Sequence, residues 1–186
     1  GKSYFYQNPL QSDGTHRRQS WFECACCPSN IARLLSSLGG YFYGISREGL
    51  WVHMYGESKV TANILEERKV ILTQTTNYPW SGDINIKVSP DTETSFTLFL
   101  RIPTWCKKAE FSVNGKYVEK LVRPGSYLPI PRIWKQGDEV QLNLSMSVDF
   151  LETHPHSSNN ARLAISRGPL IYCIETVDHQ GVDLFD

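Results

Sequence analysis

The sequence of 186 residues is long enough to form one sizeable hydrophobic core, or two small β domains that share an interface. Its 19 basic and 19 acidic residues balance and are mixed along the chain, which argues against nucleic acid or an anionic membrane as a partner. No apolar run approaches the roughly 20 residues that a membrane-spanning helix needs. We therefore expect a soluble protein.

The five cysteines are spaced unevenly, at Cys24, Cys26, Cys27, Cys106 and Cys173. An odd number, with three cysteines inside four positions, is a poor disulfide framework, whereas clustered thiolates suit a soft metal such as zinc. This pattern favours a reducing compartment, and we expect the cytoplasm, with the periplasm as the alternative. The two isolated cysteines, Cys106 and Cys173, are expected to be small buried hydrophobic residues.

One amphipathic helix is predicted over residues 28 to 38. The apolar positions with helical spacing are Ile31, Leu34, Leu35 and Leu38. Pro28 suits a first turn, and Gly39-Gly40 is expected to end the helix. The three clustered cysteines would thus lie just before a helix N-terminus.

Beyond Gly40 the hydrophobic period changes from helical to two. The segments that read as strands are Leu50 to Tyr55, Lys59 to Leu65, Lys69 to Thr75, Asp83 to Val88, Phe96 to Ile102, Val140 to Leu144, Arg162 to Ser166 and Leu170 to Ile174. Asn114-Gly115 predicts a type I′ hairpin turn, and the polar stretch from His154 to Asn160 predicts a loop or an internal boundary. Short strands separated by turns are typical of a mainly β fold, an antiparallel β-sandwich or jelly roll. The preceding helix cannot bury its apolar face alone, so it either packs on the sandwich or belongs to a helical domain. We expect the second, with the helix as the remnant of that domain.

The chemistry of the chain is concentrated in Cys24-Ala25-Cys26-Cys27-Pro28. A structural zinc site needs four ligands, and this is a single cluster, so His16, Glu23, a second copy of the chain or residues outside this sequence would have to complete it. Spacing alone leaves a metal site and reduced structural cysteines equally open. A helix N-terminus and a bound zinc would each stabilise a thiolate at Cys26 or Cys27, and a thiolate is what a nucleophile requires.

The segment from Tyr6 to Asn30, YQNPLQSDGTHRRQSWFECACCPSN, resembles the cysteine segment of glycoside hydrolase family 127, the β-L-arabinofuranosidases. Later runs resemble the β region of the same family: LRIPTW from Leu100, VNGK from Val113, WKQGD from Trp134 and SRGPLIY from Ser166. The resemblance covers nearly the whole chain. It implies an (α/α)6 barrel followed by β-sandwich domains. We therefore expect residues 1–44 to end the catalytic barrel, residues 45–150 to form a β-sandwich, and residues 151–186 to add further strands of a possible second sandwich.

The resemblance also implies a mechanism, in which terminal β-L-arabinofuranosyl or related residues are released with retention. Cys26 would be the nucleophile and a Zn²⁺ ligand, and Cys27 would be a ligand only. The remaining zinc ligands, one glutamate and one cysteine, and the glutamate acid/base lie in an earlier segment in the family, and none of these positions occurs in this sequence. We therefore expect a glycosidase as the parent protein, acting on carbohydrate with no nucleic-acid or membrane partner, and an inactive isolated chain that can form a homo-oligomer.

Two other functions are compatible with the sequence: a non-catalytic β-sandwich module that binds carbohydrate or braces a catalytic domain, and a structural zinc module. Four tryptophans are candidates for a sugar-stacking platform, although packing between sheets is favoured for Trp51, Trp80, Trp105 and Trp134. The His154 and His156 pair is expected to be solvated rather than bound to metal.

Overall fold

The computed structural model describes residues 2–7, 12, 14–24, 26–64, 68–157 and 162–182. The chain divides into two compact units, Gly1–Tyr41 and Phe42–Asp186. Ala25, Leu65 and residues 158–160, which belong to segments interpreted above, lie outside the described residues.

The first unit contains helix α1, Cys26–Ser37, and most of the short helix α2, Gly39–Phe42. One expectation for this region was wrong in detail. The helix begins at Cys26, so Cys26 and Cys27 lie in its first turn rather than before it, and Pro28 still costs nothing because the first four N–H groups have no helical partner. Helix α1 ends at Ser37, just before Gly39-Gly40 as expected, and these two glycines begin the separate short helix α2.

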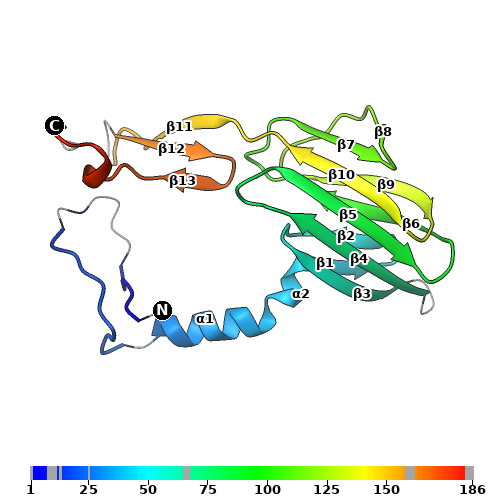
Figure 1. Ribbon diagram of the computed structural model, residues 1–186, viewed down its shortest axis with the longest axis horizontal. Coiled ribbons are helices and arrows are strands. Elements are labelled where there is room, and N and C mark those ends of the chain that lie inside the picture. The colour runs from blue at the N-terminus through cyan, green and yellow to red at the C-terminus, as the bar shows by residue number, and fades with distance from the viewer. Residues whose placement is uncertain are drawn as a thin grey trace. The chain divides into compact units, whose positions relative to one another are not determined.

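Two sheets and a third, smaller one make up the second unit (Figure 1). The four-stranded sheet has the order β1-β2-β6-β9, with strands Tyr43–Ser46, Gly49–Val52, Thr94–Arg101 and Tyr127–Trp134. The six-stranded sheet has the order β3-β4-β5-β10-β7-β8, with strands Ser58–Ile64, Arg68–Thr76, Asp83–Pro90, Asp138–Leu144, Ala109–Val113 and Lys116–Tyr117. The third sheet, β11-β12-β13, comprises Val148–Glu152, Leu163–Arg167 and Leu170–Tyr172.

The hydrophobic core lies between the four-stranded and six-stranded sheets. In β5 the side chains alternate between exposed or half-buried and buried positions, as the two faces of a strand require. Residues from both sheets share one apolar cluster, which includes Leu50, Leu98, Ile86, Leu72 and Leu142. The predicted mainly β sandwich is confirmed, and the strand pairings are antiparallel except between β2 and β6.

Several strands differ from those predicted. The strand predicted from Leu50 to Tyr55 ends at Val52. The strands β1, β7, β9 and β11 were not predicted as strands from the sequence, and β9 was obscured by Pro129 and Pro131. Proline cannot donate to a ladder, so it weakens the strand signal, but it is tolerated here because β9 is an edge strand.

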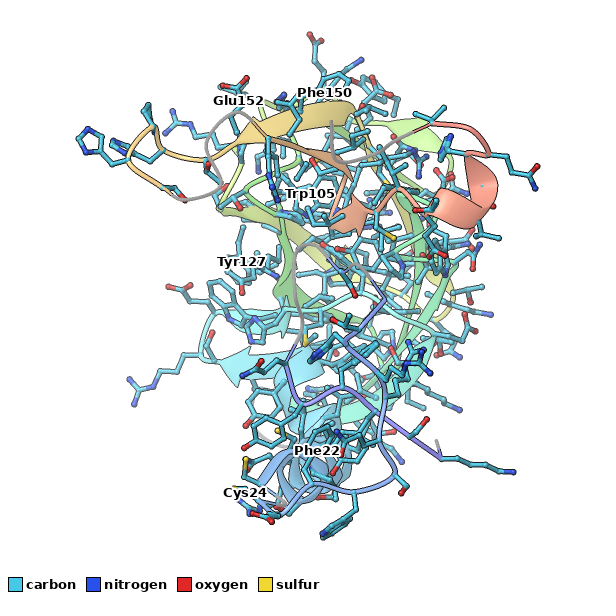
Figure 2. The ribbon with its side chains drawn as sticks, turned by 90° about the vertical axis from the view of Figure 1, so that its left-hand side faces the viewer. Phe22, Cys24, Trp105, Tyr127, Phe150 and Glu152 are labelled. Atoms are coloured by element: carbon cyan, nitrogen blue, oxygen red, sulfur yellow. The ribbon has the colours of Figure 1, made fainter. Side chains whose placement is uncertain are left out.

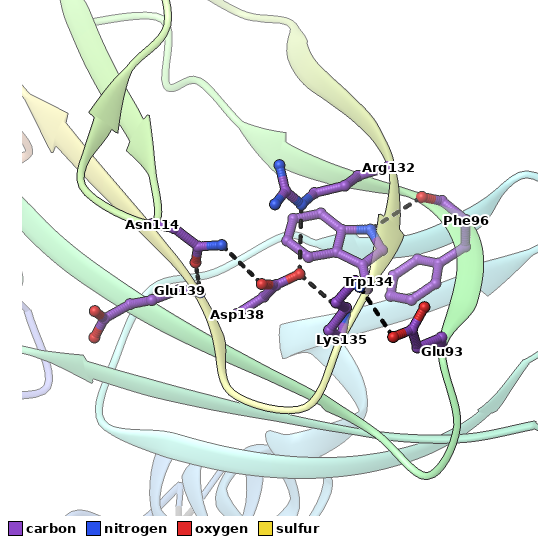
Figure 3. Close-up of polar contacts among 8 residues, drawn as sticks. All are labelled: Glu93, Phe96, Asn114, Arg132, Trp134, Lys135, Asp138 and Glu139. Carbon is purple, nitrogen blue, oxygen red and sulfur yellow. Dashed lines mark hydrogen bonds and ion pairs between the residues drawn. The ribbon is translucent and has the colours of Figure 1, made fainter.

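A buried carboxylate connects the β7–β8 hairpin with the β9–β10 turn (Figure 3). Asn114 and Gly115 have φ values of 51° and 73°, which confirms the predicted type I′ turn. Asp138 accepts hydrogen bonds from the Asn114 side chain at 2.8 Å and from the Lys135 N–H at 3.0 Å, with Arg132 Nε at 3.4 Å. Asn114 in turn accepts a hydrogen bond from the Glu139 N–H. These hydrogen bonds hold the β7–β8 turn against the β9–β10 turn.

The isolated cysteines and the tryptophans divide between core and surface. Cys106 is buried as expected, but Cys173 is exposed, which corrects the expectation for that residue. Trp134 is completely buried, whereas Trp80 is 63% exposed. The expected packing between the sheets is therefore confirmed for Trp134 and wrong for Trp80. No helix among the described residues is long and apolar enough to cross a membrane.

Candidate active site

Aromatic side chains organise the segment that leads to helix α1. Tyr4 and Gln19 form an isolated antiparallel bridge, which brings the start of the chain beside the residues that precede the helix. The rings of Tyr4 and Tyr6 contact Phe22, with centroids 5.2 and 5.3 Å apart. Figure 2 labels Phe22 and Cys24 in this unit. The cluster holds Tyr6 close to the cysteines.

Tyr6, Cys26 and Cys27 meet at the first turn of α1. The Tyr6 hydroxyl lies 2.9 Å from Cys26 Sγ, and Cys26 Sγ lies 3.7 Å from Cys27 Sγ. The Cys26 side chain is exposed and that of Cys27 is half-buried. The Ser29 hydroxyl donates to the Cys26 carbonyl at 3.1 Å. The two sulfur atoms are thus presented together, with the more accessible one carrying the tyrosine contact.

The hydrogen bonds distinguish the two thiols electrostatically. The hydrogen bond with Tyr6, and after it the one with Cys27, lowers the pKa of Cys26 below its ordinary value. The same contacts raise the pKa of Cys27, chiefly through Cys26, and raise that of Tyr6, again chiefly through Cys26. The positive end of the helix dipole also favours negative charge at this position. Cys26 is therefore the cysteine of this pair that ionises first, with Tyr6 donating to its thiolate.

The sulfur separation fits a shared zinc ion. Two thiolates bound at about 2.3 Å with tetrahedral geometry lie roughly 3.8 Å apart, and Cys26 and Cys27 place their sulfur atoms at 3.7 Å. Two further ligands would be needed to complete a tetrahedron. The residues present therefore fit half of a zinc coordination shell.

The other ligand candidates do not complete a metal site with this pair. His16 stacks on Phe5 and its Nε2 lies 3.1 Å from the Gln7 carbonyl oxygen. Glu23 and Cys24 are exposed. Cys24 interacts with Tyr6 and Cys26, where it helps to raise the pKa of the first and to lower that of the second. Among the described residues, however, no group of three or more His, Cys, Asp and Glu side chains is arranged to hold a metal ion. The His154 and His156 rings lie 5.2 Å apart without a third partner of this kind in the described chain.

Tyr6 is the part of the site that the sequence reasoning missed. It lies twenty residues before Cys26 in a segment without regular secondary structure, so no periodicity connects the two. The available signal was its position at the start of the segment that carries the family resemblance, in the aromatic run Tyr4-Phe5-Tyr6.

Comparison with known families accounts for three successive parts of the chain. Residues 1–40 match the GH127 β-L-arabinofuranosidase catalytic domain, residues 49–146 match the middle domain of the same enzymes, and residues 148–185 match the family 127 C-terminal domain. The cysteine pair lies in the part that matches the catalytic domain.

Individual relatives agree with this assignment. The chain is 36% identical to the non-reducing end β-L-arabinofuranosidase of Bifidobacterium longum subsp. longum, over 97% of this chain and 30% of that protein. A crystal structure of a GH127 β-L-arabinofuranosidase from Geobacillus stearothermophilus T6 is 44% identical, with a TM-score of 0.84, over 96% of this chain and 30% of the other. A solved GH127 β-arabinofuranosidase is 38% identical, with a TM-score of 0.86 and the same coverage. The chain spans about 30% of the length of these relatives, and it belongs to glycoside hydrolase family 127.

Proposed function

We propose that this chain is part of a retaining glycosidase that releases terminal β-L-arabinofuranosyl, or related, residues, with Cys26 as the nucleophile. The observation that carries the proposal is the cysteine pair in the first turn of α1, where Cys26 has a lowered pKa and a hydroxyl donor 2.9 Å away. The match of residues 1–40 to a catalytic domain supports it.

The proposed reaction has two displacements at the anomeric carbon. In the first, the Cys26 thiolate forms a C–S bond as the C–O bond to the leaving group breaks, and the leaving oxygen takes a proton from a carboxylic acid. In the second, water attacks the same carbon and gives a proton to that carboxylate, while the C–S bond breaks and the thiolate returns. Two inversions give overall retention. Tyr6 would orient the thiolate through its hydrogen bond.

Cys26 and Cys27 are the residues of this chain that would hold Zn²⁺. When bound, the ion would keep both thiols deprotonated at neutral pH. The remaining ligands, a glutamate and a cysteine, and the glutamate acid/base are proposed to come from an upstream segment, as the family resemblance implies. The 186-residue chain by itself is then expected to be inactive.

Release of p-nitrophenol from p-nitrophenyl β-L-arabinofuranoside tests the proposal. The comparison is between the 186-residue chain and a chain extended by an upstream region like that of the matched relatives. We expect activity only in the extended chain, and its loss in Cys26→Ser. The control variant is Cys173→Ser, because Cys173 is also exposed but lies far from the pair in the sequence. Full activity in the extended Cys26→Ser variant would exclude Cys26 as the nucleophile.

Metal content tests the zinc site separately. We expect about one zinc per extended chain, and clearly less in Cys27→Ser and in the 186-residue chain. One firmly bound zinc in the 186-residue chain would instead favour a self-contained structural site and would weaken the assignment of Cys26 as nucleophile.

A further inference from the structure

A groove of about 450 Å³ lies along the open side of the sandwich, between the β7–β8 hairpin and β9. It is formed where the edge strand β8 of the six-stranded sheet faces the edge strand β9 of the four-stranded sheet. The groove lies in the unit that does not contain Cys26. The groove and the candidate active site therefore belong to different units of the chain.

The groove combines an apolar floor with a basic rim. Phe111, Val113 and Ile130 line it with buried side chains. Lys116, Lys120 and Arg132 contribute three cationic groups, and none of the described residues that line the groove carries a carboxylate. Asp138 forms an ion pair with one of these cations, with its Oδ2 3.4 Å from Arg132 Nε. The rim therefore has an excess of positive charge in a chain with no net charge.

The free edge of β9 is closed to an additional β-strand. The Lys120 ammonium group donates to the Pro129 carbonyl at 2.7 Å, which shows that this carbonyl points away from the partner strand β6. The N and C=O groups of one strand residue point to the same side, so Pro129 and Pro131 present nitrogen atoms without hydrogen to the groove. A peptide that bound by strand addition would leave its own carbonyl groups there without donors. The groove suits a ligand that does not need a backbone ladder.

We propose that this groove binds an acidic oligosaccharide, with a uronate carboxylate held by Lys116, Lys120 and Arg132 and sugar C–H faces lying against the proline and valine side chains. The carboxylate meets the cationic rim, and the weakly apolar faces of the sugar ring match the floor. The choice of a carbohydrate over other anions rests on the proposed glycosidase function. The groove would then retain the chain on an acidic polysaccharide while the candidate active site acts on a neutral terminal sugar.

The test is an NMR chemical-shift titration of the 186-residue chain with trigalacturonate at low salt. A neutral trisaccharide of similar size and acetate are the comparison ligands. We expect saturable shifts with trigalacturonate, centred on residues 111–132, and much weaker binding of both comparison ligands. Binding should weaken by about fivefold or more in the double variant Lys116→Gln/Lys120→Gln, because two exposed charge contacts are removed.

The matched control is Lys59→Gln/Lys69→Gln, in which two exposed lysines are removed from β3 and β4 at the opposite end of the six-stranded sheet. This variant should bind trigalacturonate like the unchanged chain. Equal binding of the neutral trisaccharide or of acetate, the absence of saturable binding, or equal weakening in the control variant would each overturn the proposal. Cys26→Ser is expected to abolish activity of an extended chain and to leave trigalacturonate binding unchanged. A failure of the groove and a failure of the proposed function are therefore told apart.

Discussion

The indole nitrogen of Trp134 donates a hydrogen bond to the backbone carbonyl oxygen of Phe96 at 3.0 Å, inside the sandwich. Trp134 is completely buried, and its ring lies 5.7 Å from that of Phe96. A buried tryptophan needs a partner for its N–H, and this contact supplies one without a side-chain acceptor. The end of β9 is thus fixed to the beginning of β6.

Replacing Trp134 by Phe should lower the free energy of unfolding by about 2–4 kcal/mol, because the change leaves a cavity and removes a buried hydrogen bond. Trp80→Phe is the control, since this residue is 63% exposed, and it should change stability by no more than about 0.5 kcal/mol. Urea unfolding followed by far-ultraviolet circular dichroism measures both. Equal effects of the two substitutions would contradict the structural role of Trp134.

Asp138→Asn should destabilise the protein by about 1–3 kcal/mol. The substitution removes a negatively charged acceptor of hydrogen bonds from the Asn114 side chain and the Lys135 N–H, and it removes the ion pair with Arg132. Glu93→Gln is the control, since Glu93 is an exposed partner of Lys135 at 3.0 Å, and a surface ion pair contributes less than about 1 kcal/mol.

The Asp138 variant also has a pH signature. Burial raises the pKa of Asp138. The hydrogen bonds from Asn114 and Lys135 and the charge of Arg132 together lower this pKa by more than burial raises it, so the net shift is downward. A lowered folded-state pKa stabilises the protein above the unfolded value of about 3.9, and this contribution is lost as the pH falls toward the folded pKa. Asp138→Asn should therefore flatten the loss of stability below that pH. A slope equal to that of the unchanged protein would show that Asp138 contributes nothing to it.

Gly49→Ala should destabilise the sandwich by about 3 kcal/mol or more. Gly49 has a φ of 148°, and an added Cβ would lie 2.0 Å from the Thr97 carbonyl oxygen on β6. The obstacle is backbone, so a side-chain rotation cannot relieve it. Gly40→Ala is the control, because nothing lies within 4 Å of its added Cβ. Thermal unfolding of both variants checks the expectation, which fails if Gly49→Ala melts with the unchanged protein.

Tyr6→Phe should slow the alkylation of Cys26 by iodoacetamide near neutral pH by roughly threefold or more, because the thiolate loses a hydrogen-bond donor and its pKa rises. The rate is measured on chelator-treated protein by mass spectrometry of the Cys26 peptide, with the Cys173 peptide as an internal reference. Tyr41→Phe, at an exposed tyrosine of α2, is the matched variant. An unchanged Cys26 rate in Tyr6→Phe would show that the hydroxyl does not tune the thiol.

Local sequence signals predicted those parts of the fold that depend on neighbouring residues. The alternation of apolar and polar residues predicted β5 and β6, and Asn114-Gly115 predicted the hairpin turn between β7 and β8. The parallel pairing of β2 with β6 could not be predicted, because it joins residues about fifty positions apart and no local sequence signal marks the two strands as partners. The two prolines of β9 gave a misleading local signal, since their tolerance depends on an edge position that only the assembled sheet defines.

The candidate site shows the same division. The cluster of three cysteines drew attention to this segment, and the family resemblance singled out Cys26 and Cys27. The structure brings their sulfur atoms to a separation suited to one metal ion. Their roles as nucleophile and ligands stay predictions. The contact between Tyr6 and Cys26 joins positions twenty residues apart, and no local rule connects them.

The central place of β10 has a consequence for synthesis of the chain. This strand lies between β5 and β7, so it joins β3, β4 and β5 to the β7–β8 hairpin, although it is the last of the six strands in sequence. During translation the earlier strands would emerge from the ribosome with the edges of β5 and β7 unpaired. Folding of this layer is therefore expected to wait until Leu144 has left the exit tunnel, and a nascent chain arrested before β10 should depend on chaperones to stay unaggregated.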